Sequence, residues 1–420
     1  MIMIADDLTG ALDTCVQFVK QGASAALVSA YELQNLLKKQ DLGYDIIVVN
    51  AETRHMSDQG AYETVYALIS QICAMSAESV YIKTDSGLRG RIGSSLQAAL
   101  DAGGKMFIPF LPALPSMNRV TKGGIQWIDG LPIHQSVYGL DPFDPIRSPY
   151  VRDLFADQKA AAFEFSAEAA IPQSFDLPAV GIFDSESHDD FRAIAEKLKK
   201  NDQLSIVAGC AGFASELSKQ LIPAPKLRKI PKVSKDKPLL IICGSLSAVS
   251  ERQMDAAEEL TAGRVVLSPR QLLFPDYFES SEGKKWITEL IRLHSGKSVL
   301  IIETGFKQKK EVMEFGAGLG LDINSLRDLI PVSLGAMVKR MQDMGKLDCY
   351  TLCIIGGDTA MGCMRSLNWQ AVYPAEELLP GAVLSSVSIP GGSINMITKS
   401  GSFGEEYFVE RLREKLSDSE

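Results

Sequence analysis

The chain has 420 residues, too many for one typical hydrophobic core, and its 46% hydrophobic and 23% charged residues exclude a collagen-like or largely disordered protein. A formal net charge of −9 argues against nucleic acid or an anionic membrane as a partner. No apolar run reaches the roughly 18 residues of a membrane span, and Asp6 falls too early for a secretory leader, so we expect a cytoplasmic protein.

Strand and helix patterns alternate from the first residues onward. The helix expected after Asp7 has one apolar face, made of Ala11, Leu12, Cys15, Val16 and Val19. Short β-branched runs predict buried strands at 45–50, 79–83, 105–110 and 204–209. This alternation predicts an α/β fold, with a largely parallel or mixed sheet flanked by helices.

The segment "PAPKLRKIPKVSKDKP" interrupts the alternation and is rich in proline and basic residues, as exposed linkers are. After it the pattern restarts, with strands expected at 239–243, 299–303 and 351–355. We therefore predict two domains, at 1–222 and 238–420, joined by a linker at 223–237. A second irregular segment, 112–150, is rich in Gly, Pro and Asp, and its aromatic residues favour an ordered lid or insertion.

Two adjacent carboxylates, Asp6 and Asp7, stand where the first strand should end. Ligands of open α/β sheets bind at this end of the strands. Asp7 or Thr9 could cap the following helix, but a cap needs only one polar residue. The second carboxylate is therefore available to accept a hydrogen bond or proton from a substrate hydroxyl, or to help hold Mg²⁺.

A second polar cluster, "KTDSGLRGR", again follows a predicted strand and precedes a helix. It gathers Lys83, Asp85, Ser86, Arg89 and Arg91. Arg side chains bind carboxylate or phosphate in a planar, two-pronged way, and Lys adds a point charge. The alternative is a charged surface turn, but the combination favours an anion site with hydroxyl-binding groups beside it.

Three loops of the second half have the strand–loop–helix order of phosphate sites. In "IIGGDTAMGCM", Gly356 and Gly357 end a strand, and Asp358 or Thr359 could cap the next helix. The others are "CGSLSAVSERQ" and "TKSGSFGEEYF". One such loop could be a tight turn, but three in one domain favour nucleotide binding.

Taken in order, "IADDLTGALD", "KTDSGLRGRIG", "GGDTA" and "TKSGSFG" resemble the four-carbon acid sugar kinases, the DUF1537 family, over almost the whole chain. The resemblance implies an ATP-dependent kinase of threonate, erythronate or 3-oxo-tetronate that uses ATP and Mg²⁺. It also implies that the N-terminal domain holds the sugar acid, the C-terminal domain holds ATP, and the active site lies in the interdomain cleft. Gly87 and Arg91 depart from the family's usual Thr and Asn, which leaves the exact acid open.

Carried over residue by residue, the resemblance assigns substrate binding to Asp6, Asp7, Thr9, Lys83, Asp85, Ser86 and Arg89. It assigns ATP binding to Ser245, Ser247, Gly356, Gly357, Asp358, Thr359, Ala360, Lys399, Gly401 and Gly404. Lys83 and Arg89 are expected to meet the acid's carboxylate, and either Asp7 or Asp85 is the catalytic base. The Mg²⁺ ligands are left open, as is the oligomeric state, for which a homodimer is the candidate.

Two other functions remain open on the sequence. One is a sugar-acid and nucleotide sensor that binds both ligands without turnover. The other is a nicotinamide-dependent dehydrogenase, which is weakened because no strict Gly-x-Gly-x-x-Gly follows a strand.

Overall fold

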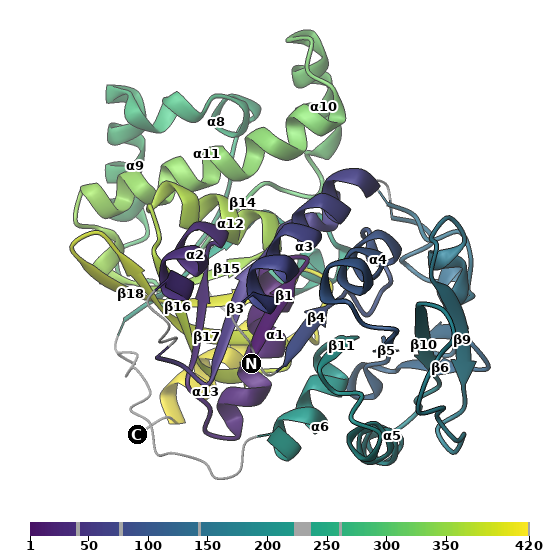
Figure 1. Cartoon of the computed structure of the whole chain (residues 1–420). Coiled ribbons are helices and arrows are strands. Elements are labelled where there is room, and N and C mark those ends of the chain that lie inside the picture. The colour runs from purple at the N-terminus through teal and green to yellow at the C-terminus, as the bar shows by residue number, and fades with distance from the viewer. Residues whose placement is uncertain (39–42, 75–78, 142–143, 222–236, 260–262, 419–420) are drawn as a thin grey trace. The chain divides into compact units, whose positions relative to one another are not determined.

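The computed structural model describes residues 1–38, 43–74, 79–141, 144–221, 237–259 and 263–418 (Figure 1). The chain divides into two units, Met1–Arg228 and Lys229–Glu420. All of the predicted linker 223–237 except Lys237 lies outside the described residues, so the predicted domain limits stay predictions.

Unit 1 is built on a parallel sheet with the strand order β2-β3-β1-β4-β11-β5-β10-β9. These strands are β1 (Ile2–Ala5), β2 (Ala25–Val28), β3 (Ile46–Asn50), β4 (Val80–Lys83), β5 (Phe107–Leu111), β9 (Ala161–Phe165), β10 (Ala179–Phe183) and β11 (Ile206–Gly209). From β1 the chain passes to the outer strand β2, returns to β3 beside β1, and then crosses to β4 on the other side of β1. The strand order therefore reverses around β1, where open α/β sheets bind ligands.

Helices connect most of these parallel strands, whereas β5, β9 and β10 follow one another without an α-helix between them. They are α1 (Leu8–Lys20), α2 (Ala30–Lys38), α3 (Asp58–Cys73), α4 (Ile92–Gly103), α5 (His188–Lys200) and α6 (Ala211–Leu221). Helix α1 packs on α6, and α3 packs on α4. The predicted apolar face of α1 is buried from Ala11 to Val16, while Val19 is half-buried. Asp7 caps this helix by accepting a hydrogen bond from the Gly10 amide.

The irregular segment 112–150 is ordered over its described residues. It forms a small antiparallel sheet of β6 (Arg119–Lys122), β7 (Ile125–Ile128) and β8 (Leu131–Pro132). Short 3₁₀ turns flank this sheet at Pro115–Met117, Ile133–Gln135 and Val151–Phe155. The segment is therefore an insertion between β5 and β9, one of the two forms that its aromatic content predicted.

Unit 2 has a mixed sheet with the order β13-β14-β12-β15-β18-β17-β16, parallel as far as β18 and antiparallel beyond it. Its strands are β12 (Leu239–Cys243), β13 (Gly263–Val266), β14 (Val299–Glu303), β15 (Thr351–Ile355), β16 (Ala371–Leu379), β17 (Ala382–Ile389) and β18 (Gly392–Lys399). The predicted strands at 239–243, 299–303 and 351–355 are present with the predicted limits. The predicted α/β class with parallel or mixed sheets is confirmed.

The helices of unit 2 are α7 (Ala248–Glu259), α8 (Pro269–Leu273), α9 (Ser281–Leu293), α10 (Lys309–Gly318), α11 (Ile323–Asp343), α12 (Gly357–Ser366) and α13 (Phe408–Asp418). Met254 of α7 and Phe408 and Leu412 of α13 are buried with Ile241 and Ile301 in one apolar core. Among the described residues, no helix combines the length and apolar character needed to cross a membrane.

Candidate functional site

Three neighbouring strands of unit 1 end in charged residues that contact one another. Asp6 and Asp7 follow β1, Lys83 ends β4, and Arg54 lies in the 3₁₀ turn Thr53–His55 just after β3. Arg54 Nε donates to Asp6 Oδ2 over 2.8 Å and its Nη2 to Asp7 Oδ1 over 2.7 Å. Lys83 Nζ lies 3.4 Å from Asp6 Oδ1 and 3.5 Å from Asp7 Oδ1. Two cations therefore hold the adjacent carboxylates in place.

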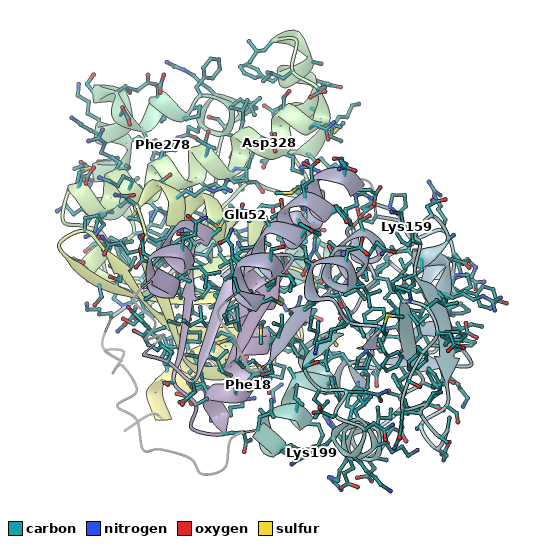
Figure 2. All side chains as sticks on the ribbon, in the orientation of Figure 1. Phe18, Glu52, Lys159, Lys199, Phe278 and Asp328 are labelled. Carbon is teal, nitrogen blue, oxygen red and sulfur yellow. The ribbon has the colours of Figure 1, made fainter. Side chains whose placement is uncertain are left out.

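The backbone directs Arg54 into this cluster. Glu52, labelled in Figure 2, has a left-handed φ of 53° between β3 and the 3₁₀ turn. Such a conformation is uncommon for a residue with a side chain. The Arg54 amide then donates to the Asp6 carbonyl over 3.3 Å. Both the main chain and the side chain of Arg54 are thus tied to the end of β1.

The charges of this cluster shift the pKa values of Asp7 and Lys83. Burial alone would raise the pKa of Asp7, but Arg54 and Lys83 outweigh it and lower this pKa to about 2. Burial likewise opposes the charge of Lys83, yet Asp6 and Asp7 raise its pKa. At neutral pH Asp7 is therefore a fixed hydrogen-bond acceptor, and Lys83 is a fixed cation.

Asp85 and Arg89 form a second pair in the loop between β4 and α4. Arg89 Nε donates to Asp85 Oδ2 over 2.7 Å, and Arg54 Nη2 lies 3.8 Å from Asp85 Oδ1. Burial would raise the pKa of Asp85, but Arg89 and Arg54 hold it well below its usual range. Arg54 thus links this pair to the carboxylates of β1. The predicted residues Asp6, Asp7, Lys83, Asp85 and Arg89 lie in one connected network.

The insertion 112–150 holds the loop 84–91 from outside. Arg119 Nη1 donates to Ser86 Oγ over 2.7 Å, and Gln126 Nε2 donates to the Ser86 carbonyl over 3.0 Å. Asp144 Oδ2 accepts from the Gly90 amide over 2.8 Å. The predicted residue Ser86 is therefore held by the insertion. The predicted residue Thr9 lies elsewhere in the network, where its hydroxyl donates to Asp7 Oδ2 over 2.7 Å and supports the Asp7 carboxylate.

Arg54, Arg119 and Tyr138 belong to this site, and the sequence analysis missed all three. Arg54 could have been found, because it closely follows the predicted strand 45–50. The end of that strand must lie near the strand ends that carry Asp6 and Lys83. Arg119 and Tyr138 lie in the insertion, where no periodic pattern indicates which side chains turn inward.

The three predicted phosphate loops of unit 2 follow β12, β15 and β18, which are adjacent parallel strands. A β-carbon added at Gly401 would come within 2.8 Å of Ser245 Cβ, and Ser250 Oγ donates to the Gly401 carbonyl over 2.8 Å. Gly356 has a φ of 110°, and a β-carbon there would lie 3.2 Å from Thr359 Oγ1. The three loops therefore meet at one end of the sheet.

One detail of these loops differs from the prediction. Helix α12 begins at Gly357 with Gly356 as its N-cap, so neither Asp358 nor Thr359 caps it. Thr359 is buried, Asp358 is exposed, and Ala360 is buried in the first turn. The glycine cap has no side chain, so the N-terminus of helix α12 stays accessible to a phosphate.

The two other loops hold the remaining predicted residues. Ser247 Oγ accepts from the Val249 amide over 3.2 Å, and Gly404 lies beside Lys399 in the third loop.

Lys399 ends β18 and is fully buried. Its ammonium donates to the Ser400 carbonyl over 2.9 Å and lies 5.0 Å from the centre of the Phe408 ring. Burial lowers its pKa to about 8, against the opposing influence of Cys243 and Cys353. In this structure Lys399 contacts the loop backbone, and its predicted contact with ATP stays a prediction.

The depressed pKa of Lys399 predicts a measurable pH dependence. Between about 8 and the ordinary value of 10.5, the unfolded lysine holds a proton that the folded one lacks. The folded state should therefore gain stability as pH rises through this interval. Urea unfolding should show the free energy of unfolding of the native protein rising relative to Lys399→Met by roughly 2–3 kcal/mol from pH 8 to 10.5. A constant difference between the two proteins would contradict this assignment.

Metal ligands are sparse in the described part of the chain. It holds no group of three or more His, Cys, Asp or Glu side chains arranged to bind an ion, and Cys353 is buried while Cys349 is exposed. Magnesium in kinases is often held by one or two carboxylates together with substrate phosphates. The Mg²⁺ ligands therefore stay open, as the sequence left them.

Family models match the two halves of the chain separately. Residues 1–217 match the family described as "Sugar-binding N-terminal domain", and residues 240–409 match the "Nucleotide-binding C-terminal domain". A D-threonate kinase of Salmonella typhimurium is 26% identical, with 98% of this chain and 99% of the relative covered. A D-erythronate kinase of Heliobacterium modesticaldum is 23% identical, with 96% and 94% covered. A 3-oxo-tetronate kinase of Haemophilus influenzae is 22% identical, with 97% and 98% covered.

Solved structures resemble the fold as a whole. The Haemophilus influenzae protein HI1011, of family DUF1537, superposes with a TM-score of 0.69 at 18% identity, covering 99% of both chains. A structure from Salmonella typhimurium LT2 gives a TM-score of 0.74 at 19% identity over 98% of both chains. The family matches cover both halves of the chain, and the chain belongs to the four-carbon acid sugar kinase family, DUF1537.

Proposed function

We propose that this protein is an ATP-dependent kinase that phosphorylates a hydroxyl of threonate, erythronate or 3-oxo-tetronate. The observation that carries the proposal is the connected ion-pair network of Asp6, Asp7, Lys83, Asp85 and Arg89 at the reversal point of the unit 1 sheet. Sugar acids present a carboxylate and several hydroxyls, and this network offers both cations and acceptors. The names of the relatives point to the same class of substrate.

On the acid side, Lys83 and Arg89 would meet the carboxylate, while Asp7 and Asp85 accept hydrogen bonds from hydroxyls. A carboxylate with a pKa of about 2, as at Asp7, is a weak base. Phosphoryl transfer tolerates this, because its loose transition state needs mainly positioning and charge stabilisation. Asp7 and Asp85 both remain candidates for the group that finally takes the proton.

On the nucleotide side, the loops at Ser245 and Ser247, at 356–360 and at 399–404 would surround the phosphates with backbone N–H groups. The N-terminus of α12 adds the positive end of its helix dipole. Magnesium, bound with ATP, would neutralise charge on the phosphates. A homodimer remains a candidate assembly.

The acid site predicts a selective defect for Arg89→Lys. The variant keeps the charge but loses the planar fork that also holds Asp85 over 2.7 Å. Acid affinity should fall by about 1.5–3 kcal/mol, the scale of a charged hydrogen bond, while ATP affinity stays unchanged. Isothermal titration with each ligand measures both, and Arg292→Lys on the exposed face of α9 serves as the matched control. An unaltered acid affinity would remove Arg89 from the site.

A coupled ADP-release assay over the four-carbon acids tests the proposed reaction. ADP formation that depends on one of these acids supports the kinase. Binding of both ligands without ADP release would instead favour the sensor, and a change in nicotinamide absorbance would favour the dehydrogenase.

A further inference from the structure

Tyr138 occupies an unusual position in the insertion of unit 1. Its ring lies between two guanidinium groups, 5.1 Å from Arg89 Cζ and 5.3 Å from Arg119 Cζ, measured to the ring centre. Both cations also hold the loop that carries the predicted acid-binding residues, through Asp85 and Ser86. Tyr138 is therefore part of the wall of this site.

The space for the ring exists because residue 87 is glycine. A β-carbon at Gly87 would lie within 2.6 Å of Tyr138 Cδ1 and 2.7 Å of Cζ, far inside van der Waals contact. Any side chain at this position would displace the ring. The backbone of the 84–91 loop and the aromatic face of Tyr138 are thus in direct contact.

The phenol oxygen of Tyr138 has no hydrogen-bond partner among the described residues, although the side chain is only 3% exposed. A buried hydroxyl left without a partner costs about 1–3 kcal/mol, so native structures rarely retain one without a reason. The hydrogen bonds that Tyr138 does form involve only its backbone: its amide donates to Ser136 Oγ, and its carbonyl accepts from the Ile146 amide. The described residues therefore leave the phenol oxygen without a partner, and a bound ligand would supply one.

We propose that the Tyr138 hydroxyl binds an oxygen atom of the sugar acid and so helps to select the substrate, an inference that rests on the proposed kinase function. The two flanking guanidinium groups create a positive field that favours an electron-rich ligand oxygen at this point. A phenol can donate to a carboxylate or exchange hydrogen bonds with a hydroxyl. Tyr138 then acts as a specificity residue, and Gly87 acts as the positioning residue that admits its ring.

Tyr138→Phe tests the inference, because it removes the oxygen and keeps the ring. Isothermal titration should show acid affinity falling roughly three- to tenfold, with ATP affinity unchanged. Thermal stability should stay the same or rise, because an unpaired buried hydroxyl has been removed. The matched control is Tyr66→Phe on α3, whose side chain is 42% exposed and which should alter neither affinity.

A second variant, Gly87→Ala, tests the role of the ring position. Its added methyl group should push the ring out of place and lower acid affinity at least as much as Tyr138→Phe does. Threonate and erythronate differ in the configuration of one hydroxyl, so comparing them tests whether Tyr138 contacts that hydroxyl. A changed ratio of their affinities in Tyr138→Phe identifies the hydroxyl in which they differ, and an equal loss identifies the carboxylate or a hydroxyl that both acids share.

Two results would overturn the inference, and they are distinguishable. If the native protein binds a four-carbon acid and Tyr138→Phe binds it equally well, the hydroxyl plays no part in recognition and the kinase proposal is unaffected. If the native protein binds none of the acids, the proposed function fails and this inference fails with it.

Discussion

Replacing Arg54 by methionine is expected to destabilise the protein by about 3–5 kcal/mol at neutral pH, the usual cost of removing one partner from a buried ion cluster. Arg54 is 12% exposed and contacts Asp6 and Asp7 over 2.7 Å and Asp85 over 3.8 Å. Without it three neighbouring carboxylates would share Lys83 and Arg89. Urea unfolding at pH 7 measures the difference in the free energy of unfolding.

The difference in the free energy of unfolding between the native protein and Arg54→Met should shrink in acid. In the native protein the pKa of Asp7 is lowered from 3.8 to about 2, so its ionised form contributes stability above pH 4 that is lost as pH falls towards 2. Without Arg54 this pKa should rise, and the carboxylates would protonate earlier and repel one another less. The difference between native protein and variant should therefore be largest near pH 7 and shrink below pH 4.

A matched control separates this effect from the loss of any arginine. Arg292 pairs with Glu289 on the surface of α9 and is 67% exposed. Arg292→Met should leave the free energy of unfolding nearly unchanged, because exposed ion pairs contribute little to stability. A similar cost for both variants would mean that Arg54 does not hold the carboxylate cluster together.

Gly401→Val should abolish useful ATP binding while leaving the acid site intact. The new β-carbon would come within 2.8 Å of Ser245 Cβ, so the loops after β12 and β18 would have to separate. Losing two charged hydrogen bonds from the phosphates corresponds to about 3 kcal/mol or more, at least a hundredfold in affinity. Isothermal titration with ATP and with the acid measures both sites in the same variant.

Gly392→Val is the control for this substitution. Gly392 begins β18, the strand that leads into the Gly401 loop, and a β-carbon there would meet nothing within 4 Å. The control should fold and bind ATP as the native protein does. If Gly401→Val folds and also binds ATP normally, the phosphates lie elsewhere and the assignment of the three loops is wrong.

Much of the fold follows from local sequence. Buried strands such as Val299–Glu303 and Thr351–Ile355 are short β-branched runs between helical patterns. This alternation can be recognised in the sequence without a structure. The site at the ends of β1 and β4 was also predictable, because motifs that follow parallel strands meet at one edge of the sheet. The same reasoning grouped the three glycine loops of unit 2.

Other features depend on contacts between distant residues. Arg54 and Asp6 are 48 positions apart, so the place of Arg54 after a predicted strand could have indicated the site but not its contact with Asp6. Tyr138 reaches Gly87 from an insertion whose sequence has no periodicity, so its inward direction is set only by the folded loop. The sequence predicted Lys399 as a phosphate ligand. It did not indicate that this side chain is fully buried, with its ammonium facing the Phe408 ring. The predicted interdomain active site stays a prediction.

Phosphorus NMR of a reaction mixture holding the protein, ATP, Mg²⁺ and a four-carbon acid tests the central claim most directly. The proposed function predicts that the γ-phosphate signal is replaced by that of a phosphate ester on the acid, in step with ADP formation. The ester should be absent when the acid is omitted. Release of free phosphate without an ester, or no consumption of ATP with any of the acids, would contradict the claim that this protein is a four-carbon acid kinase.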